Sequence, residues 1–394
     1  AIMTAEIGII NRRGIALAAD SAMTVSTTNK VTVINDATKL FSLKNKNYVG
    51  MMIYQNEEFM NVPWEVIIDS FSDYMGDNVE PHLNNYVSLF LDYLNDLDIY
   101  TEQTEEQLIL NNAWTALNYL PDNPQSIDEI EDALNKLQQT FHANKLIDMS
   151  VEELSQKYEK LINKVFETKY NHQANDLESL FVKTVMELIT STVMSNNYTG
   201  LIIAGYGSKD LFPSLYQLSI DGRINGQIKY KIETVDITEP KRCNTTGGII
   251  PFAQSDVVKE LISGIDPGLK NTITQQASNI INKLDQYIDS FYPSDNRMQD
   301  FKNSINSIVQ QRYSYFTNYI KNNYSDPIVD FVESLSLNEM GKMAQTLVNL
   351  TSFRRKYAGD IRTVGGITKV LLISKANGPV WFNEGRVNEN DYFE

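Results

Sequence analysis

Three polar side chains near the start of the chain could do chemistry if the fold brings them together. They are the hydroxyl of Thr4, the carboxylate of Asp20 and the ammonium of Lys39. A hydroxyl becomes a better nucleophile when a neighbouring positive charge lowers its pKa, and a carboxylate can hold that charge in place. The elements between these residues decide whether the three groups can meet.

The residues around Asp20 predict a β-hairpin. Residues 4–10 alternate and are rich in β-branched side chains, Asn11-Arg12-Arg13-Gly14 is turn material, and 15–19 is apolar again. Asp20 therefore ends a strand. Further strands are predicted at 39–43, 48–53, 200–206, 214–220 and 369–374, with the strongest hairpin turn signal at Asp221-Gly222.

Helical periodicity fills the two intervals between the strands. It runs from about 87 to 193, with capping signals at Ser126 and Ser150, and from 254 to about 350. The second interval contains one wide apolar stripe, which favours a core or partner-helix face over a cofactor site: Ile273, Ala277, Ile280, Ile281, Leu284, Ile288 and Phe291. Strands at both ends and in the middle, with helices between, predict an α+β layered domain.

Composition excludes several functional classes. The 394 residues are 42% hydrophobic and 21% charged, which suits a globular chain of one or two domains. Without a long apolar run or a leader, we expect a cytoplasmic protein that makes no membrane contact. The net charge of −16 opposes nucleic-acid binding. A single cysteine, Cys243, and three scattered histidines leave little for a metal site, and no metal or cofactor is expected.

Several short motifs follow one another along the chain. The first is the segment 4–21, which ends in Ala18-Ala19-Asp20-Ser21. The others are Lys39-Leu40-Phe41, Ile202-Ile203-Ala204-Gly205, Gly247-Gly248, and Asp360-Ile361-Arg362-Thr363 before Gly365-Gly366. In this order they resemble the motifs of the proteasome β subunits and their bacterial relatives, which are N-terminal nucleophile hydrolases. The resemblance implies one domain over 1–394 with a four-layer αββα sandwich. The helical segments at 85–198 and 269–335 would be insertions in it.

The resemblance also implies a set of roles. Thr4 would be the nucleophile, with its own α-amine as the base. Lys39 would lower the pKa of the hydroxyl, Asp20 would hold Lys39, and Asp360 and Thr363 would orient the amine. Backbone N–H groups near Tyr54 would stabilise the oxyanion, at a position where the family has glycine. The expected activity is threonine-type peptidase, acting on a peptide or protein substrate.

Two further positions depart from the family pattern. Gly248 stands where the family's loop has a serine beside the threonine amine, and Ser255 and Thr246 are the alternatives for that hydroxyl. Ala1-Ile2-Met3 precedes Thr4, so its nitrogen is an amide until those residues are removed. If the encoded chain begins at Met3, removal of that methionine would expose Thr4.

Two alternatives stay open beside the peptidase. One is a catalytically silent structural subunit of the same fold, whose helical insertions mediate assembly. The other is an amide hydrolase that acts on non-peptide substrates. In each case the family's ring assemblies imply a homo-oligomer, and an unfoldase or another protein is a candidate partner.

Overall fold

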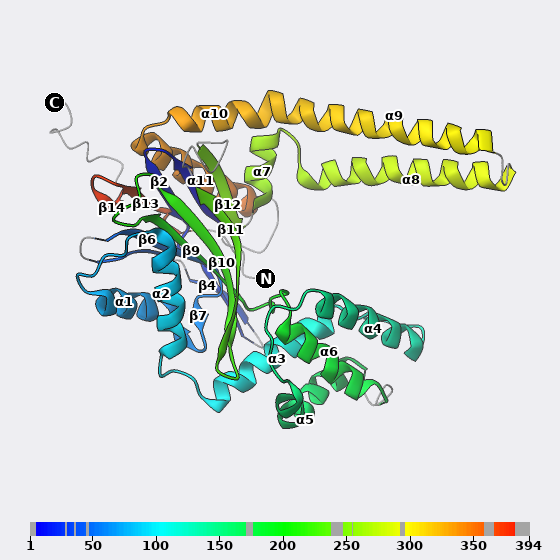
Figure 1. Ribbon diagram of the computed structural model, residues 1–394, viewed down its shortest axis with the longest axis horizontal. Coiled ribbons are helices and arrows are strands. Elements are labelled where there is room, and N and C mark those ends of the chain that lie inside the picture. The colour runs from blue at the N-terminus through cyan, green and yellow to red at the C-terminus, as the bar shows by residue number, and fades with distance from the viewer. Residues whose placement is uncertain are drawn as a thin grey trace.

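The computed structural model describes residues 5–27, 30–34, 37–44, 47–170, 176–237, 247–253, 255–291, 296–357 and 366–382 of the 394-residue chain. Within these ranges the protein is a mixed α+β fold, in which two five-stranded sheets are accompanied by helices (Figure 1). The α+β class predicted from the sequence is confirmed.

The first sheet holds the predicted hairpin. Its strand order is β12-β1-β2-β13-β14, and every neighbouring pair is antiparallel. The strands are β1 (Glu6–Asn11), β2 (Gly14–Ala19), β12 (Gly247–Ala253), β13 (Lys369–Ser374) and β14 (Gly378–Trp381). Glu6 pairs with Ala19. The start of β1 and the end of β2 therefore lie side by side, and Asp20 follows directly.

The second sheet has the order β11-β10-β9-β6-β5 and is also antiparallel. Its strands are β5 (Leu40–Ser42), β6 (Tyr48–Gln55), β9 (Thr199–Tyr206), β10 (Ser214–Ile224) and β11 (Gln227–Ile237). Lys39 immediately precedes β5, and its carbonyl accepts the N–H of Ile53 at 2.9 Å. Two short pairs complete the strands: β3 (Met23–Thr27) with β4 (Lys30–Ile34), and β7 (Glu58–Phe59) with β8 (Val62–Pro63).

Side chains from both sheets form one buried cluster, so the two sheets pack against each other. Leu17 of β2 lies in this cluster with Met52 of β6 and Ile202 of β9. The other face of β2 carries Ala16 and Ala18, which belong to a second cluster shared with helices. Because neighbouring residues of a strand point to opposite faces, a strand covered on both sides is apolar throughout, as β2 is.

Helices cover the outer faces of the sheets. α1 (Trp64–Met75) and α2 (Leu83–Asp96) share a core with the second sheet. α7 (Ser255–Ser263), α10 (Asp326–Ser334) and α11 (Leu337–Tyr357) lie against the first sheet. Pro63 precedes the first residue of α1.

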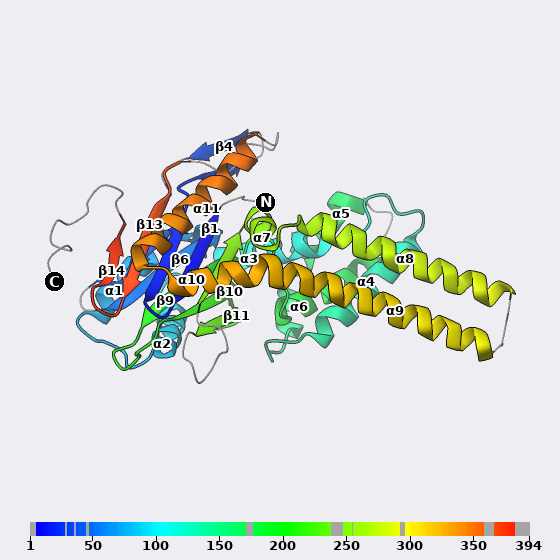
Figure 2. The ribbon, with the colours of Figure 1, turned by 90° about the horizontal axis from the view of Figure 1, so that it is seen from above.

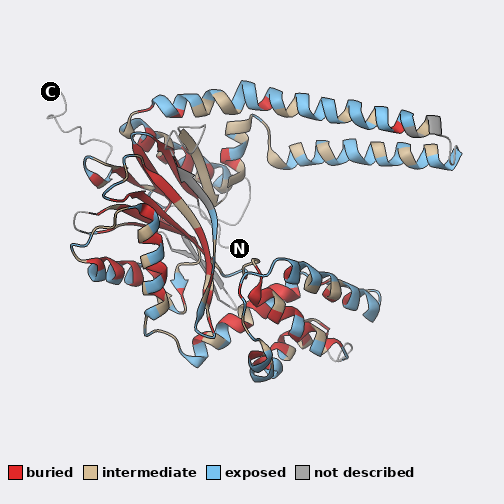
Figure 3. Ribbon diagram, in the orientation of Figure 1, coloured by how far each residue is buried: buried red, intermediate tan, exposed pale blue. Residues whose placement is uncertain are grey.

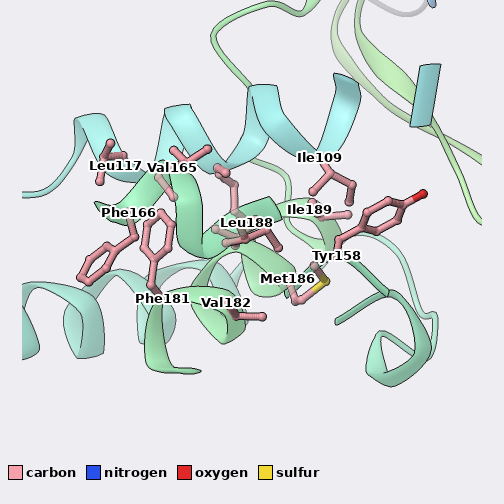
Figure 4. Packing of buried hydrophobic residues seen from close by; sticks show 14 of the residues in the cluster. Ile109, Leu117, Tyr158, Val165, Phe166, Phe181, Val182, Met186, Leu188 and Ile189 are labelled. Atoms are coloured by element: carbon pink, nitrogen blue, oxygen red, sulfur yellow. The ribbon is translucent and has the colours of Figure 1, made fainter. Parts of the chain in front are cut away.

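Four helices form a block with its own core. They are α3 (Glu102–Asn118), α4 (Ile127–Ala143), α5 (Glu152–Tyr170) and α6 (Glu178–Thr190). Figure 4 shows their aromatic and aliphatic side chains meeting between the helices, with Phe166 stacked on Phe181 at 4.8 Å between ring centroids. Because α2 belongs to the layer on the second sheet, this block starts at Glu102, whereas the sequence placed the start of the insertion at 85.

A long antiparallel helical hairpin projects from the sheets. It consists of α8 (Pro267–Phe291) and α9 (Asn296–Ile320), and α9 continues through the π-helical turn η2 (Lys321–Ser325) into α10 (Figure 2). α8 contains no buried residue, and Figure 3 shows the exposure along both helices. Lys302 Nζ lies 2.5 Å from Asp289 Oδ1, which joins the two helices near their connected ends.

A buried ion pair ties the helical block to the second sheet. Lys229 Nζ of β11 lies 2.6 Å from the carbonyl oxygen of Val193, 3.0 Å from that of Leu188, and 3.3 Å from Asp221 Oδ2. The pKa of Lys229 is lowered, because burial outweighs the attraction of Asp221. Ser195 donates its backbone N–H to the same carboxylate at 3.0 Å.

The contact between Lys229 and Asp221 also explains why the prediction of a turn at Asp221-Gly222 is wrong. Asp221 and Gly222 lie inside β10, at an irregularity of the strand register, and the hairpin turns at Asn225-Gly226 instead. Both turn residues have positive φ, 47° and 79°, which an Asn-Gly turn accommodates.

We expect Lys229→Met to destabilise the fold by about 3–5 kcal/mol, because the Asp221 carboxylate would stay buried without its cation. Urea denaturation would measure the change. Lys231→Met is the matched control: Lys231 pairs with Glu233 on the surface, and its loss should cost no more than about 1 kcal/mol. Equal effects of the two substitutions would contradict a buried anchor at Lys229.

Candidate active site

Strand ends from both sheets meet at one edge of the fold. In the first sheet, Glu6 at the start of β1 pairs with Ala19 at the end of β2 and with Ala253 at the end of β12. Lys369 at the start of β13 pairs with the same Ala19. Lys39 reaches this edge from the second sheet. Side chains that the chain separates widely can therefore meet here.

Lys39 is the centre of the site. Its side chain is 2% exposed, and its Nζ lies 2.8 Å from Asp20 Oδ1 and 3.3 Å from Glu6 Oε1. It also donates to the carbonyl oxygen of Ala22 at 2.6 Å. Two of these contacts, to Asp20 and Ala22, are hydrogen bonds, and the contact with Glu6 is an ion pair. The predicted contact between Asp20 and Lys39 is therefore present.

The surrounding charges keep Lys39 protonated. Burial by itself favours the neutral amine, but the negative charges of Glu6 and Asp20 outweigh that effect and raise the pKa of Lys39 above its ordinary value of 10.5. Lys39 thus supplies a permanent positive charge at neutral pH. Held by two hydrogen bonds and the Glu6 ion pair, it can act on a further group through its charge.

A third carboxylate lies in the same electrostatic environment. Burial raises the pKa of Glu57, while the charge of Lys39 lowers it, and the net direction is upward. Glu57 follows β6 and accepts the N–H of Trp64 through its backbone carbonyl at 3.0 Å. Among the described residues, its buried Oε1 has no hydrogen-bond partner. Glu57 therefore influences Lys39 through its charge, whereas Glu6 and Asp20 contact it directly.

The chain preceding β1 is attached to this cluster. Ala5 donates its N–H to Asp20 Oδ1 at 3.4 Å, and the backbone N–H of Asp20 donates to the Ala5 carbonyl at 3.2 Å. Ala5 is buried. The carboxylate that holds Lys39 thus also holds the residue that follows Thr4.

Three of the predicted catalytic residues, Thr4, Asp360 and Thr363, lie outside the described residues. After Asp360 and Thr363, the described chain resumes at 366. It lies at the same edge of the fold, because Ile367 donates its N–H to Ser21 Oγ at 2.9 Å. The roles of these three residues remain predictions.

Tyr54 is a core residue. Its ring is 4% exposed, lies in the cluster between the sheets and faces Phe252 with 6.1 Å between centroids. Its hydroxyl accepts a hydrogen bond from Gln217 Nε2 at 2.8 Å, and burial raises its pKa. Gly200 pairs with Tyr54, and a Cβ there would lie 1.9 Å from the ring. A glycine on the neighbouring strand thus provides the room for this ring. The oxyanion role of the nearby backbone stays a prediction.

Gly248 does not join the site. It pairs with Ile10, four residues along β1 from Glu6, which corresponds to about 13 Å of strand. The end of β12 that reaches the site is Ala253, and Ser255 follows two residues later as the first residue of α7. The strand register therefore favours Ser255 over position 248 as the source of the hydroxyl expected beside the Thr4 amine.

Sequence reasoning missed the two glutamates. Glu6 is fully buried at the start of a strand that is apolar over 7–10, and that mismatch was a usable signal, because a buried carboxylate requires a partner. Glu57 gave no such signal, since it lies in a polar segment after β6 and reaches the site only through the tertiary fold.

No protein-family model matches the chain, and curated proteins provide no sequence match.

In the part of the chain that the structure describes, no helix is long and apolar enough to cross a membrane. In the same part, no cluster of His, Cys, Asp or Glu side chains could hold a metal ion.

The raised pKa of Lys39 predicts a particular pH dependence of stability. Because the folded-state pKa lies above the ordinary 10.5, the stabilising charge is fully present below pH 10.5 and is lost as the pH rises through the folded-state value. The difference in unfolding free energy between wild type and Lys39→Met should therefore be constant from about pH 7 to about pH 10 and shrink above that. Urea denaturation over this range would measure it. A difference that already shrinks between about pH 7 and 9 would contradict a charged Lys39.

Proposed function

We propose that this protein is an amide hydrolase of the threonine type, with Thr4 as the nucleophile once the residues before it have been removed, and that its substrates are peptides. One observation carries the proposal: the buried Lys39 ammonium is held by Asp20, and the same carboxylate holds Ala5, the residue bonded to Thr4. A permanent positive charge next to a hydroxyl lowers the pKa of that hydroxyl.

The proposed reaction is acyl transfer in two steps. The Thr4 Oγ attacks the substrate carbonyl carbon, and the free α-amine of Thr4 accepts the hydroxyl proton. The C–N bond then breaks, the proton passes to the leaving amine, and an ester remains on Thr4. Water adds to the ester with the same amine as base, which releases the acid and regenerates the hydroxyl. Lys39 stabilises the developing alkoxide in both steps.

The layers of the fold support this proposal. Two sheets share one core cluster, α1 and α2 cover the second sheet, and α10 and α11 cover the first. We propose that these layers form the αββα sandwich of the N-terminal nucleophile hydrolases. The site lies where that family's nucleophile would enter, at the start of β1.

Turnover of peptide and non-peptide amide substrates tests the proposal. We expect the form that begins at Thr4 to be active, Thr4→Ser to retain activity, and Thr4→Ala to lose at least about 10³-fold in kcat/KM. Lys44→Ala is the matched control for a lysine substitution, because Lys44 makes only surface ion pairs with Asp69 and Asp73 among the described residues. It should leave the rate unchanged, whereas Lys39→Ala should lower it strongly.

The outcomes separate the proposal from its alternatives. Turnover confined to non-peptide amides would overturn the peptide substrate and keep the nucleophile. Lack of turnover by the free-Thr4 form across the substrate panel would support the silent subunit. Activity that survives Thr4→Ala would contradict the nucleophile itself.

The strand register predicts which loop residue assists the threonine amine. Ser255 lies beyond Ala253 at the edge that carries the site, and Gly248 lies opposite Ile10 away from it. We expect Ser255→Ala to lower kcat by about 10-fold with little change in KM, since a hydrogen bond to the reacting amine would be lost. Gly248→Ser should have no such effect, because a Cβ there meets no atom closer than 4.0 Å. The reverse result would contradict the register-based assignment.

A further inference from the structure

The α8 helix carries an apolar seam that has no partner in the described chain. Its members recur with alternating spacings of four and three residues, the heptad pattern of helices that pack along their length: Ile273, Ala277, Ile280, Leu284, Tyr287 and Phe291. All six are exposed. The side of α8 that is less exposed, through Thr274, Ile281 and Ile288, is the side toward α9.

The α9 helix repeats this arrangement. Phe301, Ile308 and Tyr315 are seven residues apart, and all three are exposed together with Tyr319. Around the axis of each helix, the exposed seam lies about a quarter turn from the side that faces the other helix, and the direction of this turn, viewed along the chain, is the same in both helices. Because the two helices run in opposite directions, both seams lie on the same face of the hairpin. We call this surface the apolar face.

The opposite face of the hairpin is mainly polar, with Tyr313 as an exposed aromatic residue on it. About a quarter turn from the contact side in the opposite direction lie the following residues: Asn271, Gln275 and Asn282 on α8, and Asn303, Asn306 and Gln310 on α9. Such a division of a projecting hairpin into one apolar and one polar face indicates that the apolar face is covered in the assembled protein.

Charge indicates what covers it. Residues 267–320 contain five Lys and Arg side chains and four Asp side chains, for a net charge of +1, while the rest of the chain carries −17. The net charge of the rest of the chain therefore makes two copies repel each other, and the hairpin does not add to that repulsion. At 25 residues, each helix extends about 37 Å, several times the Debye length of about 8 Å at physiological salt, so contact through the hairpins can keep the charged bodies apart.

The area is sufficient for a dimer. The five aromatic rings of the apolar face are between 49% and 70% exposed. At about 200 Å² for each ring, they offer about 600 Å² in each copy, and the aliphatic members add to this. A standard interface takes about 800 Å² from each partner.

We propose that the apolar face of the α8–α9 hairpin binds the same face of a second copy of this chain, so that two hairpins form a four-helix interface. A membrane surface fits less well, because membrane-surface helices carry Lys and Arg on the polar face, where this hairpin has Asn and Gln. The proposal does not depend on the catalytic role of Thr4.

Light scattering of the full chain tests the proposal. At micromolar concentration we expect a mass of twice 44.8 kDa. The double variant Ile280→Asp and Ile308→Asp should weaken the association by about 100-fold or more, because it places unpaired carboxylates in the centre of the interface. The matched control, Asn282→Asp and Gln310→Asp, adds the same charge on the polar face and should leave the dimer intact.

Two results would overturn the proposal. The first is a wild-type mass of 44.8 kDa at every concentration up to about 100 µM, which is weaker than a specific dimer of this area requires. The second is an assembly of any size that the apolar-face variant leaves unchanged. A chain that stays monomeric but binds lipid vesicles or another protein through the hairpin would also overturn the proposal. Because all four substituted side chains are exposed, circular dichroism should show unchanged helix content in both variants.

Discussion

The ammonium of Lys39 is the constraint on which the edge of both sheets depends. Removing such a charge from water costs several kcal/mol, and the fold compensates for it with oxygens from Glu6, Asp20 and Ala22. These oxygens come from the start of β1 and from the chain just after β2, while Lys39 itself precedes β5 of the other sheet. Two sheets that share an apolar core are therefore also joined by buried ion pairs at this edge.

The elements whose signals are local were predictable from the sequence. The hairpin of β1 and β2 and the strand β13 each follow from a short pattern. The Asp20–Lys39 contact followed from a resemblance in motif order and is present in the structure. Glu57 was not predictable, because its approach to Lys39 depends on where β6 ends in three dimensions.

The strand register explains two placements that the sequence patterns did not predict. Asp221-Gly222 has the composition of a turn, but a buried partner, Lys229, holds Asp221 inside β10. Gly248 matches the loop motif through its sequence neighbours. It pairs with Ile10, however, and it is the opposite end of β12, at Ala253, that lies at the site. Composition describes what a residue can do locally, and register decides which residue arrives at the site.

The most direct measurement of the central claim is the mass of the N-terminal peptide after reaction with a peptide epoxyketone, which needs both a free α-amine and the adjacent hydroxyl. For the protein from its native source, we expect a peptide that begins at Thr4 and carries one adduct. An adduct on another residue, or an N-terminus other than Thr4, would contradict the claim that the Lys39 site serves this threonine.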